Sequence, residues 1–191
     1  MSYITVKADI SSALEKFGMV EDEAKKAIVR ALNRAAKSVQ VQAAREIREA
    51  GYNLKASRIK KALTVRQANA NVLQAGIRAI GRPISLYEYG ARSTSKGVSV
   101  NVKEGRKLIK HAFIATMPTG HTGVFMRKPG VIQGKRGKMI QARALGHELF
   151  GPAIPSMFVS EIVTRAMTSK LNEQFPKELD HELGRLRARG R

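Results

Sequence analysis

The chain has 191 residues, 43% of them hydrophobic, and 35 Lys and Arg against 15 Asp and Glu give a formal net charge of +20. That hydrophobic content excludes a disordered chain, and no apolar run reaches the roughly 20 residues that cross a bilayer, so no membrane partner is expected. Cysteine is absent, which excludes disulfides and thiolate metal sites. The first residues, MSYITVKADI, do not have the pattern of a signal peptide, and the length predicts a single domain over 1–191.

The positive charge is concentrated in the middle of the chain. Residues 51–147 hold nineteen basic and two acidic residues, a net charge of +17, whereas 1–50 and 148–191 carry only +2 and +1. A field of one sign favours a polyanion or an acidic protein as partner. The alternative is a basic face that serves solubility alone, which needs far less charge of one sign.

Two helical regions are predicted, one at each end of the chain. Residues 20–50 are expected to form a long amphipathic helix, because small and apolar residues recur at three- and four-residue spacing, and Gly51 is placed to end it. A short helix is expected over 54–62, with Leu54, Ile59 and Leu63 turned inward. A C-terminal helical region spans 155–188: Pro155 opens it, its apolar stripe includes Ile162, and Pro176 ends or kinks it.

Between these helices the period changes, and residues 63–146 are predicted to form a basic sheet region. NVLQAGIRA (71–79) and GVSVNVK (97–103) alternate and indicate strands. Residues 129–147, rich in Gly, Lys and Arg, are expected to be an exposed loop with a short strand near 139–144. Residues 3–17 are expected to add a strand or a short helix.

A central β-hairpin is predicted over residues 112–127, with a four-residue loop at 118–121. This register places Phe113 and Phe125 on opposite faces. Because both faces are largely apolar, the hairpin should be covered on both sides.

The histidines do not suggest a catalytic or metal site. In the predicted hairpin His111 and His121 lie roughly 15 Å or more apart, so they cannot share a metal bound at about 2 Å. No carboxylate lies between Lys107 and Lys128 to orient either imidazole, so His121 is interpreted as a turn or contact residue. His147 and His181 appear equally isolated in the sequence.

Other catalytic patterns are missing as well. The sequence has neither the glycine–lysine pattern of a P-loop nor a Rossmann glycine motif. Two carboxylates in the middle segment are too few for a two-metal nuclease site, although acidic residues from elsewhere could converge in space. Aromatic residues are 5% with no Trp, which gives little support for base stacking on single strands, whereas attraction to duplex DNA needs only Lys and Arg. The sequence predicts no cofactor, no metal and no enzymatic activity.

Four segments carry a family resemblance: ALNRAAKSVQVQAAREI, RPISLYEYGARSTSKGVSVNV, AFIATMPTGHTGVFMRK and GPAIPSMF. In this order they resemble the minor tail protein Z family of long-tailed double-stranded DNA bacteriophages and their prophages, over about residues 20–175. RALGHEL, 143–149, departs from the Leu-Pro-Ile-like segment expected there. The resemblance implies an α+β fold with a long N-terminal helix, an antiparallel sheet with a central hairpin and a C-terminal helix.

The resemblance also implies a structural virion protein, assembled in the host cytoplasm, that completes the head-proximal end of the tail for head–tail joining. Copies of itself in a ring and other tail or neck proteins are the implied partners. Eight basic residues are predicted to face double-stranded DNA or an acidic partner: Arg82, Arg92, Lys96, Arg106, Lys107, Lys110, Arg127 and Lys128. A free, sequence-nonspecific binder of double-stranded nucleic acid is the main alternative, and a metal-dependent nuclease is a third.

Overall fold

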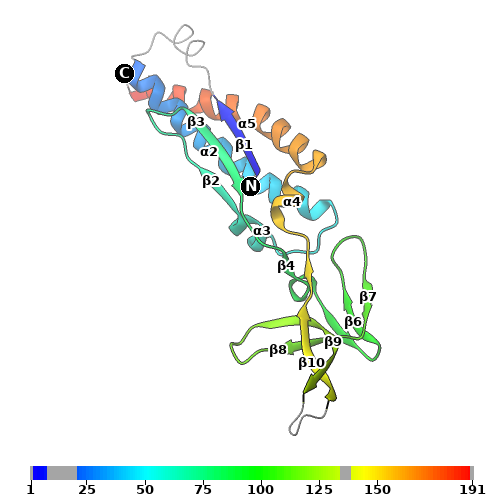
Figure 1. Cartoon of the computed structure of the whole chain (residues 1–191). Coiled ribbons are helices and arrows are strands. Elements are labelled where there is room, and N and C mark those ends of the chain that lie inside the picture. The colour runs from blue at the N-terminus through cyan, green and yellow to red at the C-terminus, as the bar shows by residue number, and fades with distance from the viewer. Residues whose placement is uncertain (1, 8–20, 134–138, 190–191) are drawn as a thin grey trace. The chain divides into compact units, whose positions relative to one another are not determined.

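The computed structural model has an α+β fold, as expected (Figure 1). It describes residues 2–7, 21–133 and 139–189, with side chains described for 23–127, 146–186 and 188. The chain divides into two compact units. The helical unit comprises Met1–Glu49, Lys55–Gly81 and Ile154–Arg191, and the strand unit comprises Ala50–Leu54 and Arg82–Ala153.

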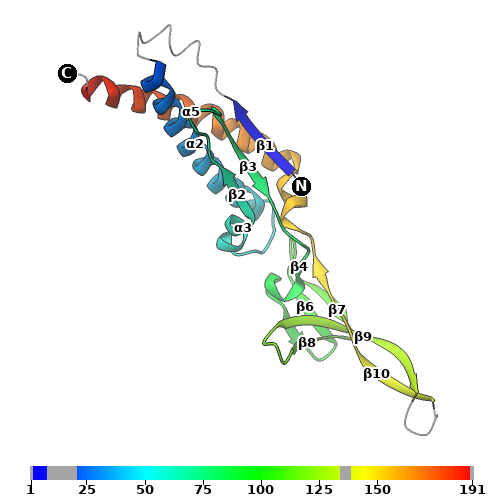
Figure 2. The same cartoon turned by 60° about the vertical axis from the view of Figure 1, so that its left-hand side comes forward.

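Two long helices and a three-stranded antiparallel sheet make up the helical unit. Its elements are β1 (Ser2–Lys7), α2 (Glu21–Glu49), α3 (Ala56–Ala62), β2 (Leu63–Arg66), β3 (Gln74–Ala79), α4 (Ile154–Phe158) and α5 (Glu161–Arg189). Strand β3 is central and pairs antiparallel with both β1 and β2. Helix α2 packs against α5 and against β2 and β3, which the two views in Figures 1 and 2 also show.

The predicted long helix and its neighbours are confirmed. Fully buried alanines of α2, such as Ala27, Ala31 and Ala35, leave room for close packing of the elements around it. Ile59 is buried in the middle of α3, and Leu63 at the start of β2. The strand expected over 71–79 is shorter, and the segment expected over 3–17 is a strand at Ser2–Lys7, with 8–17 outside the described residues.

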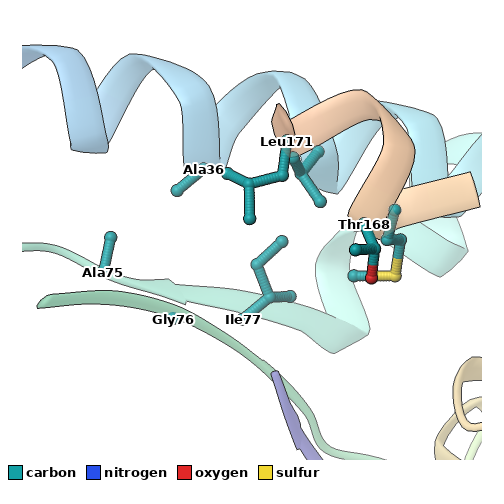
Figure 3. A pocket seen from close by; sticks show the side chains of 8 residues that line it. Ala36, Ala75, Gly76, Ile77, Thr168 and Leu171 are labelled. Carbon is teal, nitrogen blue, oxygen red and sulfur yellow. The ribbon is translucent and has the colours of Figure 1, made fainter. Parts of the chain in front are cut away.

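A small apolar pocket lies between α2, β3 and α5 (Figure 3). Its lining residues are Ala36, Val39, Ala75, Gly76, Ile77, Met167, Thr168 and Leu171. Its volume is about 20 Å³, which is close to the space that one water needs. The pocket is therefore a packing gap in the core, too small for a cofactor or substrate.

The C-terminal helix differs from its prediction at one residue. Of the two outcomes expected at Pro176, an end or a kink, the structure excludes the end, because α5 continues through this residue. A proline removes one backbone hydrogen bond, but Phe175 and Leu179 on either side pack against the core of α2, and this packing holds the helix together. Ile162 was expected in the apolar stripe and is instead 67% exposed. No helix in the described part of the chain is both long and apolar enough to cross a membrane.

The strand unit consists of small antiparallel sheets. Its elements are β4 (Ile84–Ser85), the 3-10 helix η1 (Leu86–Tyr89), β5 (Arg92–Thr94), β6 (Gly97–Val100), β7 (Lys107–Lys110), β8 (Ala112–Thr116), β9 (Thr122–Gln133), β10 (Met139–Glu148) and β11 (Phe150–Gly151). The strand orders are β5-β6-β7, β10-β9-β8 and β11-β4.

Tyr89 joins distant segments at the centre of this unit. It is fully buried, and its hydroxyl donates to the carbonyl of Pro152 at 2.9 Å. Gly151 lies against its ring, where an added Cβ would come within 2.7 Å of Cε2. The segments LYEYG and GP, both within the quoted family resemblance, therefore meet in space through one aromatic side chain.

The predicted hairpin exists, but its register is wrong by one residue. Phe113 pairs directly with Phe125, so the two rings share a face, with centroids 6.1 Å apart. The loop is the cause. Gly120 donates to the Met117 carbonyl at 2.9 Å and has φ +81, and Met117 donates to the His121 carbonyl at 2.7 Å. A turn followed by a left-handed glycine makes a three-residue loop. Because this loop is one residue shorter than the predicted one, every cross-strand pair of the hairpin moves by one residue.

The interpretation of residues 129–147 as mainly a loop is also wrong. β9 and β10 pair antiparallel through most of that segment, with an irregularity between Ala144 and His147. There the chains approach so closely that a Cβ on Gly146 would overlap the Met126 carbonyl. At the centre of the hairpin Val124 and Phe125 are both buried. Since adjacent strand residues face opposite ways, the expected cover on both faces is confirmed there.

Candidate interaction surface

The sheet β5-β6-β7 gathers five of the eight predicted basic residues. Arg92 lies on β5, Lys96 in the following turn, Arg106 just before β7, and Lys107 and Lys110 on β7, all exposed. Two cross-strand rows of three residues lie on one face of this sheet: Arg92–Ser99–Leu108 and Thr94–Gly97–Lys110. From the spacing of strands and residues, Arg92 and Lys110 are about 12 Å apart on that face. Lys107 lies opposite Val100 and so belongs to the other face.

Arg106 is held in place by the protein itself. Its Nη2 donates to the carbonyls of Gly90 at 2.7 Å and Ser99 at 2.8 Å, and its Nε donates to Ser99 Oγ at 3.1 Å. This guanidinium therefore ties the loop after η1 to β6. It contributes charge to the surface, but removing it would also disturb the sheet.

Three predicted residues lie outside this sheet. Arg127 extends from β9, and its guanidinium carbon lies 5.1 Å from the centre of the Phe113 ring, a cation–π contact. Arg82 is exposed before β4. The side chain of Lys128 lies outside the described residues.

The gathered cations have few counter-charges. Thirteen basic residues and three glutamates in the strand unit give it a net charge of +10. The ion pair of Lys103 with Glu104 spans 3.4 Å. Arg92, Lys96, Lys107 and Lys110 form no ion pair with any residue that the structure describes. We define Arg92, Lys96 and Lys110 as the basic sheet surface, leaving out Lys107 on the other face, and this surface can attract anions with little competition from its own chain.

His121 has a partner that sequence reasoning missed. Its Nε2 lies 3.0 Å from both carboxylate oxygens of Glu148, whose side chain is 15% exposed. Gly123 makes the approach possible, since a Cβ there would be 2.5 Å from a Glu148 oxygen. A glycine inside a strand often marks such a close approach, and Gly123 was the available signal. The contact fastens the turn to β10, which fits the interpretation of His121 as a contact residue.

The other histidines differ from one another. His111 links β7 to β8 with φ +60. The expectation that His181 is isolated is wrong: its Nδ1 lies 3.2 Å from Arg34 Nη1, beside the buried Glu182. Within residues 2–7, 21–133 and 139–189, no three His, Asp or Glu side chains come together in a way that could hold a metal ion.

The clear pKa shifts lie on exposed helix surfaces, away from the basic sheet surface. Hydrogen bonds from Lys177 and Lys170 lower the pKa of Glu173 to about 2. The hydrogen bond and charge of Glu49 raise the pKa of Arg45. Both are ion pairs between neighbouring helix residues, a common feature of helix surfaces.

The comparisons with known proteins identify one family. The sequence matches the family of the prophage minor tail protein Z (GPZ) over residues 9–189. No curated protein matches the chain, and no solved structure does. The match covers nearly the whole chain, including the hairpin and the Tyr89 junction that unites two of the resembling segments. The chain therefore belongs to the prophage minor tail protein Z family, a family of structural phage tail proteins.

Proposed function

We propose that this protein completes the head-proximal end of the phage tail and is needed for the tail to join a filled head. Membership in the tail protein family supports the setting. The observation that carries the finer role is the basic sheet surface, whose exposed cations have no partners among the described residues. The genome passes through the head-proximal end, so an unpaired positive surface has a polyanion to meet there.

In this proposal the protein acts as a structural part, without catalysis or a cofactor. Copies of the chain form a ring with other tail or neck proteins, and the basic sheet surface lies beside the DNA path. Arg82, Arg106, Arg127 and Lys128 add to its field. Contacts go to phosphates because DNA of any sequence must pass.

The first experiment tests the place in assembly. A phage that lacks this gene is complemented in trans, and its lysate is examined by electron microscopy. The proposal expects separate filled heads and tails without the protein, and joined particles with it. An absence of tails without the protein would contradict a role at completion and indicate an earlier structural role.

The second experiment tests which partner the basic sheet surface meets. The triple variant Arg92→Glu, Lys96→Glu, Lys110→Glu leaves the anchored Arg106 in place. A matched variant, Lys26→Glu, Lys37→Glu, Arg48→Glu, makes the same change of charge on exposed positions of α2. Binding to a labelled duplex is measured against salt, beside incorporation into tails.

Contact with DNA predicts that the slope of log affinity against log salt falls by about 2.7, at roughly 0.9 for each of three phosphate contacts. This loss, together with normal incorporation into tails, supports contact with DNA. Unchanged DNA binding with lost incorporation would mean that the surface docks on an acidic tail or head protein.

A free binder of double-stranded nucleic acid is the second candidate, favoured by the same unpaired cations. Light scattering with and without DNA separates the two. A ring or a complex with tail proteins supports the assembly role, whereas a monomer or dimer that binds duplex tightly supports the free binder. Cleavage of DNA with magnesium or manganese would instead revive the nuclease alternative.

A further inference from the structure

A second basic surface lies in the helical unit, on α3 and β2. Residues 55–81 contain six basic residues and no acidic residue. Four are exposed on this short segment and form no ion pair with any residue in the described ranges: Lys55, Lys60, Lys61 and Arg66. We define these four as the α3–β2 surface.

Its cations differ from many of those on the long helices, which have acidic partners. Arg30, Arg34 and Arg185 surround the buried carboxylate of Glu182 at 3.6, 2.7 and 3.3 Å. Elsewhere on these helices the ion pairs lie between neighbouring turns: Arg45–Glu49, Arg165–Glu161, Lys170–Glu173 and Lys177–Glu173. The α3–β2 surface lacks such compensation, so it contributes strongly to the positive field of this unit.

A fixed backbone holds this surface. α3 continues directly into β2, and the junction is secured by burial of Ile59 and Leu63 at 0% and 1% exposure. Gln40 of α2 donates to the carbonyl of Leu63. Arg66 is exposed and lies opposite Gly76 on β3, so no side chain lies directly across from it. The charged side chains are flexible, but the positions from which they extend are fixed.

The chemistry of the α3–β2 surface fits phosphates better than a protein. On α3 and β2, Ile59, Ala62 and Leu63 are buried and Val65 is half-buried, so these elements expose little apolar surface. Ile80, 47% exposed beside Ala62, adds a single apolar side chain. Protein interfaces use apolar anchors at their centres and are depleted in lysine. The segment 55–81 also has no aromatic residue, which argues against stacking on single-stranded bases.

We propose that the α3–β2 surface binds the backbone phosphates of duplex DNA without regard to sequence, as a second contact in addition to that of the basic sheet surface. Duplex DNA carries one negative charge per about 1.7 Å of axis, and lysines bind phosphates as point charges. This inference concerns the helical unit alone and does not depend on the proposed place in the tail.

The test uses the full chain with Lys60→Glu, Lys61→Glu and Arg66→Glu. The expected result is a loss of about 2.7 from the salt slope of duplex binding, at roughly 0.9 for each of three phosphate contacts. The α2 variant described above is the control, because it makes the same change of charge elsewhere in the same unit. It should lower affinity less and leave the slope nearly unchanged.

Two outcomes would overturn the inference. An equal loss in the α3–β2 variant and the α2 control would mean that only net charge matters, and an unchanged slope would mean that no phosphate is contacted. In the second case, lost incorporation into tails would assign the surface to an acidic protein. A glutamine version, Lys60→Gln, Lys61→Gln, Arg66→Gln, repeats the measurement if the reversed charges prevent folding.

The arms of the test separate this inference from the proposed function. If only the basic sheet variant loses slope, the α3–β2 surface is not a DNA contact, and the proposed function stands. If only the α3–β2 variant loses slope, the α3–β2 surface is a DNA contact and the basic sheet surface is not. Two independent losses that add in the combined variant would support two surfaces.

Discussion

The register of the central hairpin makes a measurable prediction about Phe113 and Phe125. The two residues pair across β8 and β9 on one face, with ring centroids 6.1 Å apart, a distance within the range of favourable aromatic pairs. Phe125 is 4% exposed, so truncation to Ala should cost about 3–5 kcal/mol. Phe113 is only half-buried and should cost about 2 kcal/mol, because less of its ring leaves water on folding.

The informative quantity is the coupling between the two substitutions. In the observed register the double variant should be less destabilised than the sum of the single variants, by about 0.5–1.5 kcal/mol. If the rings lay on opposite faces, as the four-residue loop implied, the effects would add within about 0.5 kcal/mol.

Urea denaturation followed by circular dichroism gives the free energies of unfolding, provided that the urea dependence stays the same among variants. The control cycle pairs Phe113→Ala with Val124→Ala. Val124 is buried and lies opposite Ile114, on the other face of the hairpin, so those effects should add. Additive effects of Phe113 and Phe125 would refute the observed register. Phe125→Leu replaces the alanine variant if the latter does not fold.

The helices were the most predictable part of the fold. The three- and four-residue spacing along residues 20–50 predicted α2 to within a residue at each end, because one face of a helix against a core imposes that period. Gly51 supplied the stop, with φ +92. These are local signals, and they do not depend on which element packs against the helix.

The hairpin register and the extent of β9 and β10 were less predictable. Pro118 to His121 allow either a four-residue or a three-residue loop, and the choice depends on whether Gly120 takes the left-handed conformation. Pairing through 129–147 depends on cross-strand contacts more than on intrinsic preference. Its charged, glycine-rich sequence has little alternation that would indicate a strand.

The candidate surfaces were predictable in charge but not in grouping. The segment 51–147 with net +17 belongs to both units, so its charge is divided between them. The structural use of Arg106, and the pairing of His121 with Glu148, come from residues brought together by folding, and neither has a local signature apart from the glycine at 123.

The remaining predictions concern strain, protonation and cooperativity. His111 has φ +60, so His111→Gly should change the free energy of unfolding by less than about 1 kcal/mol. Gly97 has φ +146, and a Cβ added there would lie 2.1 Å from the Ile109 carbonyl oxygen, so Gly97→Ala should lower the free energy of unfolding in urea by about 2 kcal/mol or more. The carboxyl of Glu173 should titrate by NMR near its pKa of about 2, below the ordinary 4.5; its contribution to stability is therefore full above pH 4.5, is lost as pH falls towards 2, and weakens with salt. The expectation of one domain predicts a single calorimetric transition, and two transitions would contradict it. The last prediction is an asymmetry at Glu182, whose side chain is 1% exposed and meets Arg34, 43% exposed, at 2.7 Å. Removal of the arginine leaves a buried carboxylate with one partner fewer, but removal of the carboxylate leaves arginines that can turn to water. Arg34→Met should therefore cost about 1.5–3 kcal/mol, the usual value for a hydrogen bond to a charged group, and Glu182→Met should be nearly neutral or stabilising. If urea denaturation shows that Glu182→Met is the more damaging change, the carboxylate contributes more to the pairing of α2 with α5 than its desolvation costs, and the reasoning from burial fails.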